Sequence, residues 1–119
     1  MSTRPVLRGT HRGLPRALER SARSAGVPFE IESHHASAWH SITFSGERHR
    51  IEARAMVGRD LDRWLAGLNA RSVDLPGEML ADLALSRCVG TDGVARMRIE
   101  GLTVRTDREP VCAVAFRQP

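Results

Sequence analysis

Residues 49–68 read HRIEARAMVGRDLDRWLAGL, and this stretch decides the fold. Its first half alternates apolar and charged residues with a period of two, which predicts a half-buried antiparallel strand over residues 49–57. Its second half places apolar residues at i, i+3, i+4 and i+7, which predicts a helix over residues 60–69. The apolar face of that helix consists of Leu61, Trp64, Leu65 and Leu68. Asp60 is the expected N-cap, Asn69 is the expected left-handed end, and the helix is expected to pack on the sheet.

Upstream of this stretch the sequence predicts a short helix and the first strand of a hairpin. Residues 13–25 form the helix, with Pro15 in its first turn and Gly26 after its end. Residues 29–44 form the strand, interrupted by a bend or bulge in the polar segment 33–37. A turn at residues 45–48 then leads into the strand over 49–57. In the expected register, Phe44 faces His49 and Ile42 faces Ile51.

Downstream, residues 79–89 alternate as a strand does, although their Met, Leu and Ala content also suits a helix. The turn Gly90-Thr91-Asp92-Gly93 favours the strand, because it leads into a second strand over 94–105. A bulge at Glu100-Gly101 is expected there to keep one apolar face. Residues 111–116 are the expected last strand. The predicted fold is α+β: an antiparallel sheet of four or five strands with two short helices on one face, in the order α-β-β-α-β-β-β.

A short internal repeat links the two predicted hairpins. Arg50-Ile51-Glu52-Ala53 recurs as Arg98-Ile99-Glu100-Gly101, each time on the second strand of a hairpin. A match over four positions can also arise by chance.

Composition bounds the class of protein. The chain has 119 residues, which suits one domain, expected at 13–119 after a flexible basic arm at 1–12. All 18 basic residues are arginine, which is typical of a GC-rich genome and points to a bacterial source. There is no apolar run of the length that a membrane span or secretory signal needs, so we expect a soluble cytoplasmic protein. The arginine-rich start of the chain also resembles an organellar transit peptide, which is the alternative. Cys88 and Cys112 are expected to be buried free thiols.

The histidines are the first candidate site. His34, His35, His40 and His49 lie in sequence near Glu30, Glu32 and Glu52, and histidine with carboxylate is a metal-binding combination. An extended strand would place His34 and His40 roughly 20 Å apart, which argues against a shared metal. No metal or cofactor is therefore predicted. A pocket for a small ligand, or an enzyme site, would be expected around His34, His40 and Trp39.

Motifs of nucleophilic catalysis and phosphate binding are absent from the sequence, which makes an enzyme the less favoured class. The remaining signal is basic. The N-terminal region is rich in arginine, which suggests contact with nucleic acid or another acidic partner through Arg4, Arg8, Arg12, Arg16, Arg20 and Arg23. The leading hypothesis is a non-enzymatic interaction module that forms a homo-oligomer. It is expected to be a dimer, formed through a sheet edge or through apolar sheet surface that two short helices leave uncovered. The alternatives are a nucleic-acid-associated protein and a binding protein or enzyme that uses the His34 and His40 region.

Overall fold

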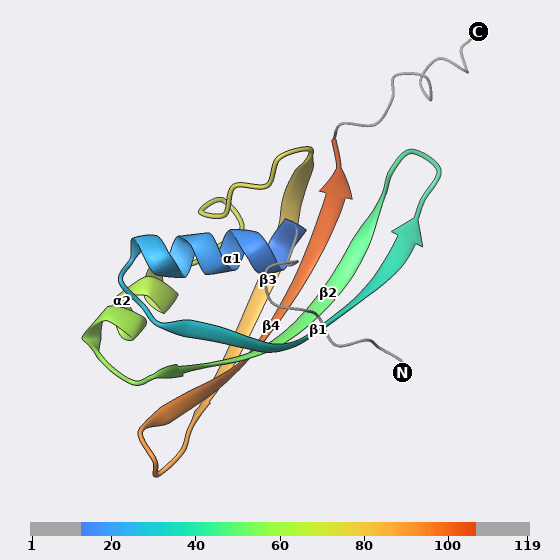
Figure 1. The fold of residues 1–119 in the computed structure, drawn as a ribbon. Coiled ribbons are helices and arrows are strands. Elements are labelled where there is room, and N and C mark those ends of the chain that lie inside the picture. The colour runs from blue at the N-terminus through green and yellow to red at the C-terminus, as the bar shows by residue number, and fades with distance from the viewer. Residues whose placement is uncertain (1–12, 107–119) are drawn as a thin grey trace, which may run out of the picture.

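The computed structural model describes residues 13–106 as one antiparallel sheet with two helices (Figure 1). The elements are α1 (Gly13–Ser24), β1 (Phe29–His40), β2 (Ser45–Met56), α2 (Arg59–Gly67), β3 (Glu78–Val89) and β4 (Val94–Arg105). The strand order is β1-β2-β4-β3, and all three pairs are antiparallel. The predicted α+β fold is confirmed with four strands. The strand expected at 111–116 lies outside the described residues.

Each half of the chain contributes one helix and one hairpin, and the second strands of the two hairpins meet at the centre of the sheet. Ile51 on β2 lies directly opposite Ile99 on β4, and both side chains are fully buried. The short repeat therefore surrounds this pair in space. On either side of it, Arg50 lies 3.6 Å from Glu100, and Arg98 lies 2.9 Å from Glu52. The two halves join through equivalent residues.

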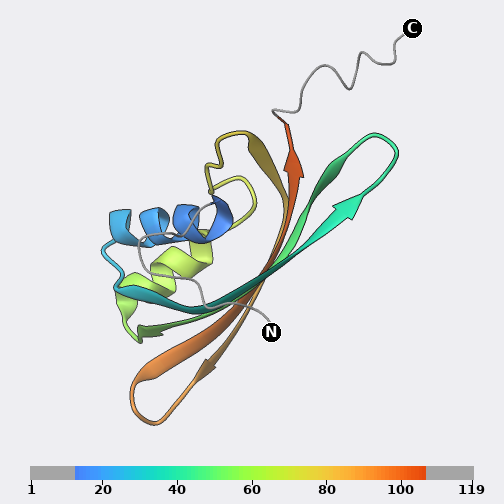
Figure 2. The same cartoon turned by 45° about the vertical axis from the view of Figure 1, so that its right-hand side comes forward.

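Both helices lie against the same face of the sheet, called here the covered face (Figure 2). The core between them consists of small and branched apolar side chains, because alternate strand residues and every third or fourth helix residue point inward. Burial of Leu61, Trp64 and Leu65 is confirmed, while Leu68 is only partly buried. From the sheet, the core receives chiefly Ile51, Ala53, Ala55, Leu80, Ala95, Met97 and Ile99.

Gly101 sets how closely α1 approaches the sheet. A Cβ atom at this position would lie 2.7 Å from Leu14 Cδ2, which is closer than real Cβ atoms come. The glycine thus leaves the space into which Leu14, fully buried, inserts. At the other end of α1, Gly26 has a φ of 75° and ends the helix as predicted.

The first hairpin differs from the prediction in its turn and register. The turn is residues 41–44 rather than 45–48, since the Ser41 amide donates to Phe44 O at 2.7 Å and Ser41 Oγ accepts from the Phe44 amide at 3.0 Å. Ile42 is therefore fully exposed and does not face Ile51, whose partner on β1 is His34.

The caps expected for α2 were also wrong. The helix begins at Arg59 after Gly58, so Asp60 lies in the first turn, where its charge suits the helix dipole. Asn69 follows the helix and accepts hydrogen bonds from the Arg71 and Ser72 amides in an Asx turn. Among residues 13–106 only glycines have a positive φ, so Asn69 is not left-handed.

The bulge expected at Glu100-Gly101 lies elsewhere. The two register shifts are between Ile31 and Ser33 on β1 and between Leu80 and Asp82 on β3. The register of β4 against β2 is continuous, so the change of apolar parity along β4 is real. Its last apolar residues, Leu102 and Val104, consequently point to the other face, called here the open face.

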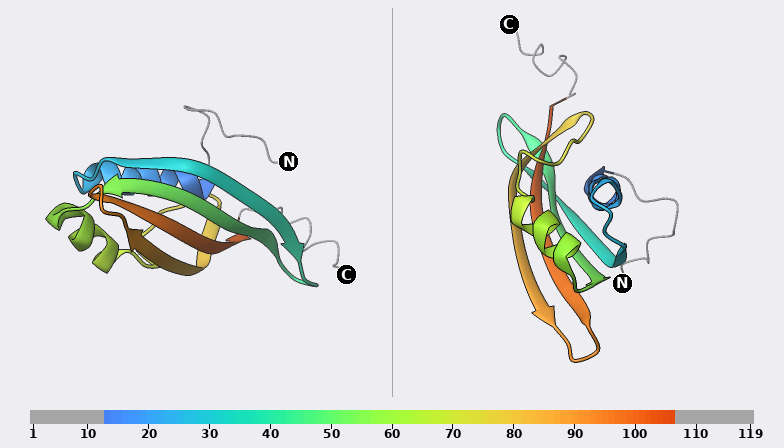
Figure 3. Two further views of the ribbon diagram at one scale, coloured as in Figure 1. Left: turned by 90° about the horizontal axis from the view of Figure 1, so that it is seen from below. Right: turned by 90° about the vertical axis from the view of Figure 1, so that its left-hand side faces the viewer.

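The sheet is strongly curved and twisted, and the helices cover only part of it (Figure 3). The hairpin of β1 and β2 extends beyond the helices, and along β3 every residue from Ala84 to Val89 is exposed. Neither helix of the described part has the length and apolar character needed to span a membrane.

Candidate functional site

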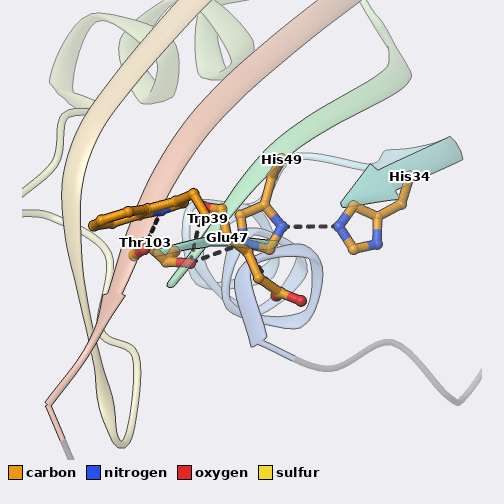
Figure 4. Close-up of polar contacts among 5 residues, drawn as sticks. All are labelled: His34, Trp39, Glu47, His49 and Thr103. Carbon is orange, nitrogen blue, oxygen red and sulfur yellow. Dashed lines mark hydrogen bonds and ion pairs between the residues drawn. The ribbon is translucent and has the colours of Figure 1, made fainter. Parts of the chain in front are cut away.

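Two histidines and a threonine form a hydrogen-bonded chain across β1, β2 and β4 (Figure 4). His34 Nε2 lies 2.9 Å from His49 Nδ1, and the two rings are stacked at 5.2 Å with an angle of 8°. His49 Nε2 lies 3.0 Å from Thr103 Oγ1, and Thr103 Oγ1 donates to Glu47 O at 3.3 Å. The hydrogen bonds thus run diagonally across the covered face and connect the three strands, because His34 pairs with Ile51 and Thr103 pairs with Glu47.

The proton positions follow from the single hydroxyl proton of Thr103. Because that proton goes to Glu47 O, the threonine oxygen accepts from His49 Nε2–H. His49 Nδ1 is then bare and accepts from His34 Nε2–H. Burial lowers the pKa of His49 from its usual 6.5, even though Glu47 Oε1 lies 3.7 Å from its Nε2 atom. A neutral His49 satisfies every contact around it, which suits a structural role.

The three residues expected to form a ligand pocket are not brought together. His34 and His40 have the same parity on β1, after its bulge, but pair with Ile51 and Ser45, six residues apart on β2. Trp39 has the opposite parity and pairs with Gly46. Its Nε1–H donates to Thr103 O at 3.3 Å, so the indole reaches across β2 to β4.

Gly46 makes this reach possible. It lies between Trp39 on β1 and Val104 on β4, and a Cβ atom there would clash with the backbone at Thr103. Val104 is buried at 8% exposure although it lies on the open face, and Met79 follows it in the same row on β3. Trp39, Gly46, Val104 and Met79 thus form one apolar row across the four strands at one end of the open face.

Beside the apolar row the open face carries a hollow of about 480 Å³ that crosses all four strands. Its lining is dominated by polar and charged side chains: His35, Ser37, Arg48, Arg50, Asp82 and Glu100. Further along the face, Arg54 lies 3.0 Å from Glu30 and 3.6 Å from Glu32. Most of these charges are satisfied in cross-strand pairs, which is how an antiparallel sheet presents one face to water.

The arginines of α1 lie around a second hollow. Arg16, Arg20 and Arg23 line it together with Glu19 and with Val27, Pro28 and Phe29 of the following segment, and its volume is about 460 Å³. Arg20 also donates to Asp74 O at 3.4 Å. Arg4, Arg8 and Arg12, the other arginines of the expected polyanion site, lie outside the described residues.

Cys88 is an exposed free thiol, contrary to the expected burial, because the second half of β3 is uncovered. Cys112 lies outside the described residues. No group of three potential metal ligands occurs between residues 13 and 106.

Sequence analysis expected an open sheet edge or uncovered apolar sheet surface but did not locate it on β3. β3 is the outer strand on its side of the sheet, and Leu85 and Val89 are exposed by 37% and 54% although they have the parity of the covered face. Arg87, between them, lies with its Nη1 atom 2.8 Å from Asp62 Oδ1 of α2. The alternation of residues 79–89 indicated a strand but gave no sign that its second half lacks a covering helix.

Comparison with family models, with curated proteins and with solved structures found nothing that matches this chain.

Proposed function

We propose that the protein is a non-enzymatic interaction module that self-associates through its sheet. The observation that carries this proposal is the second half of β3, which has no partner strand on its outer side among residues 13–106 and exposes Leu85 and Val89. Unpaired strand edges recruit further strands, and exposed apolar side chains beside them favour burial against a partner.

The histidine chain supports a structural role rather than catalysis. Both ring nitrogens of His49 have hydrogen-bond partners, and its side chain is only 3% exposed. A general base needs to reach a substrate proton, and this ring is enclosed by β1 and β4. These hydrogen bonds are better explained as a polar connection that holds β1, β2 and β4 in register.

Sedimentation velocity of the full chain across the micromolar range tests self-association. We expect a reversible monomer–dimer equilibrium whose dimer fraction rises with protein concentration. A sedimentation coefficient that stays at the monomer value throughout would contradict the proposal.

A second candidate is binding to nucleic acid or another polyanion, favoured by the three arginines that meet at the α1 hollow. The test compares the full chain with a chain that begins at Gly13, because α1 itself carries the buried Leu14 and Leu18. Each phosphate neutralised contributes about −0.9 to the slope of log affinity against log salt on duplex DNA. Loss of Arg4, Arg8 and Arg12 should then flatten the slope by about 3.

In the matched variant, Arg16, Arg20 and Arg23 are all replaced by glutamine in the full chain. If the truncated protein and this variant keep the affinity and slope of the full chain, these arginines take no part in binding. The absence of binding at low salt would remove the candidate.

The exposed thiol of Cys88 fits a reducing compartment, which supports a cytoplasmic location as part of the proposal. The bacterial source stays a prediction from the arginine usage.

A further inference from the structure

We infer that the partner of the β3 edge is a second copy of the same strand, paired antiparallel with Ser86 on the two-fold axis. The resulting dimer has one continuous sheet of eight strands. This inference rests on the self-association proposed above and assigns it a surface and a register.

The second half of β3 lacks the features that block edge pairing. Proteins protect edges with charges, proline or bulges. Residues 83–89 contain no proline, and the bulge of β3 lies before them, between Leu80 and Asp82. The one charged residue among them, Arg87, is bound to Asp62 of α2. The edge from Leu83 to Val89 therefore has no bulge, and its one charge is paired.

The side chains of this segment are complementary to themselves. On the open face they are small, namely Ala84, Ser86 and Cys88, so these side chains do not obstruct a neighbouring strand. On the covered face, Leu83 is partly buried against the core and Leu85 and Val89 are exposed. The same residues of a second copy would lie beside Leu85 and Val89 and extend the apolar surface of the covered face across the interface.

The length of the segment fixes the register. Antiparallel pairing of the whole stretch 83–89 with its copy puts its central residue, Ser86, opposite the partner's Ser86. Leu83 then faces the partner's Val89, and Ala84 faces the partner's Cys88. Arg87 faces the partner's Leu85, so the two Arg87 side chains are not directly opposed, and each is paired with Asp62 of its own chain. A shift of one residue toward Val89 would place Arg87 opposite the partner's Arg87, which opposes two like charges across the pair.

The other edge of the sheet is a poorer candidate and provides a control. On β1 the corresponding covered-face residues are His34, Ala36, Ala38 and His40, which offer little apolar area. Ser37 on β1 matches Ser86 on β3: both are exposed, both lie on the open face, and each pairs with an arginine of the adjacent strand. Ser37 faces Arg48, and Ser86 faces Arg98.

The first test replaces each serine by glutamate in the full chain. Ser86→Glu places two carboxylates opposite each other on the two-fold axis, which should raise the dimer dissociation constant by about fivefold or more. Ser37→Glu makes the same chemical change on the other edge and should leave the dissociation constant unchanged. Both glutamates lie beside an arginine of their own sheet, so we expect both variants to fold, as checked by circular dichroism.

The second test is cross-linking, which does not depend on destabilisation. Directly opposed residues of antiparallel strands have Cα atoms about 4.5–5.5 Å apart, within the range that a disulfide spans. In a chain with Cys88→Ser and Cys112→Ser, Ser86→Cys should give a covalent dimer on mild oxidation, and Ser37→Cys should not.

The outcomes separate this inference from the proposed function. Dissociation by Ser86→Glu alone, with cross-linking through residue 86, supports the pairing. A dimer that survives Ser86→Glu and does not cross-link through residue 86 overturns the pairing but leaves self-association intact. Dissociation by Ser37→Glu alone would move the interface to β1. A wild-type chain that is monomeric throughout the micromolar range overturns both.

Discussion

Replacement of Trp64 by alanine is the most direct test of how α2 is held on the sheet. The indole is 7% exposed and meets Phe29 edge to face, with ring centroids 5.0 Å apart at 72°. Its Nε1–H donates to Ser21 Oγ at 2.9 Å, which also joins α2 to α1. The side chain therefore connects both helices to the first strand.

The expected cost follows from these contacts. Truncation of a buried aromatic residue to alanine costs about 3–5 kcal/mol, because both the transfer free energy and the packing around the cavity are lost. Trp64→Phe keeps most of the apolar volume and loses the hydrogen bond to Ser21, so about 1–2 kcal/mol is expected. Leu68→Ala, at a partly buried position after the same helix, serves as a control with a smaller loss.

Urea titration followed by far-ultraviolet circular dichroism measures these differences. A loss of 4 kcal/mol at a typical urea slope should lower the midpoint by about 2 M. The total stability of a small domain is about 5–15 kcal/mol, so Trp64→Ala should leave a marginally folded protein. A loss below about 1 kcal/mol for this variant would refute the packing of α2 described above.

Two further predictions concern the polar part of the sheet. Gly46→Ala should destabilise the protein by about 1–3 kcal/mol, because the added Cβ clashes with the backbone at Thr103. The control is Gly67→Ala, where the added Cβ meets open space; the same urea titration should show a neutral or slightly stabilising effect. Burial lowers the pKa of His49 in the folded protein, so the unfolded chain takes up the proton first as the pH falls below about 6.5. The histidine therefore contributes stability above that pH and loses it below, and thermal melts from pH 7.5 to pH 5 should show a steeper fall for the wild type than for His49→Gln. If the melting temperatures of the two proteins fall equally with pH, another titrating group controls the loss of stability in acid.

The sequence by itself predicted the elements whose signal is local. The stripe of Leu61, Trp64 and Leu65 indicated α2, and the alternation of Ile51, Ala53 and Ala55 indicated β2. These patterns depend only on the periods of 3.6 and 2, which each segment carries within itself. Residues 79–89 also suit a helix, and the turn at 90–93 was needed to identify β3 as a strand. With that turn, the α+β class followed without tertiary information.

The tertiary structure decided everything that depends on pairing between segments. The turn at 41–44 placed His34 opposite Ile51 rather than Ile42, and this register brought His34 to His49. A shift of one residue would have sent the histidine to the other face, so the contact could not be derived from the spacing of histidines along the chain.

The same reason explains why the sequence could not locate the open edge on β3. The alternation of Met79, Ala81, Leu83 and Leu85 predicted a strand, yet α1 and α2 reach only part of the sheet, and Leu85 and Val89 remain exposed. Local periodicity reports which side of a strand is apolar, whereas the lengths and positions of the helices determine how much of that side is covered. Cys88, which its apolar neighbours in sequence suggested was buried, is exposed for this reason.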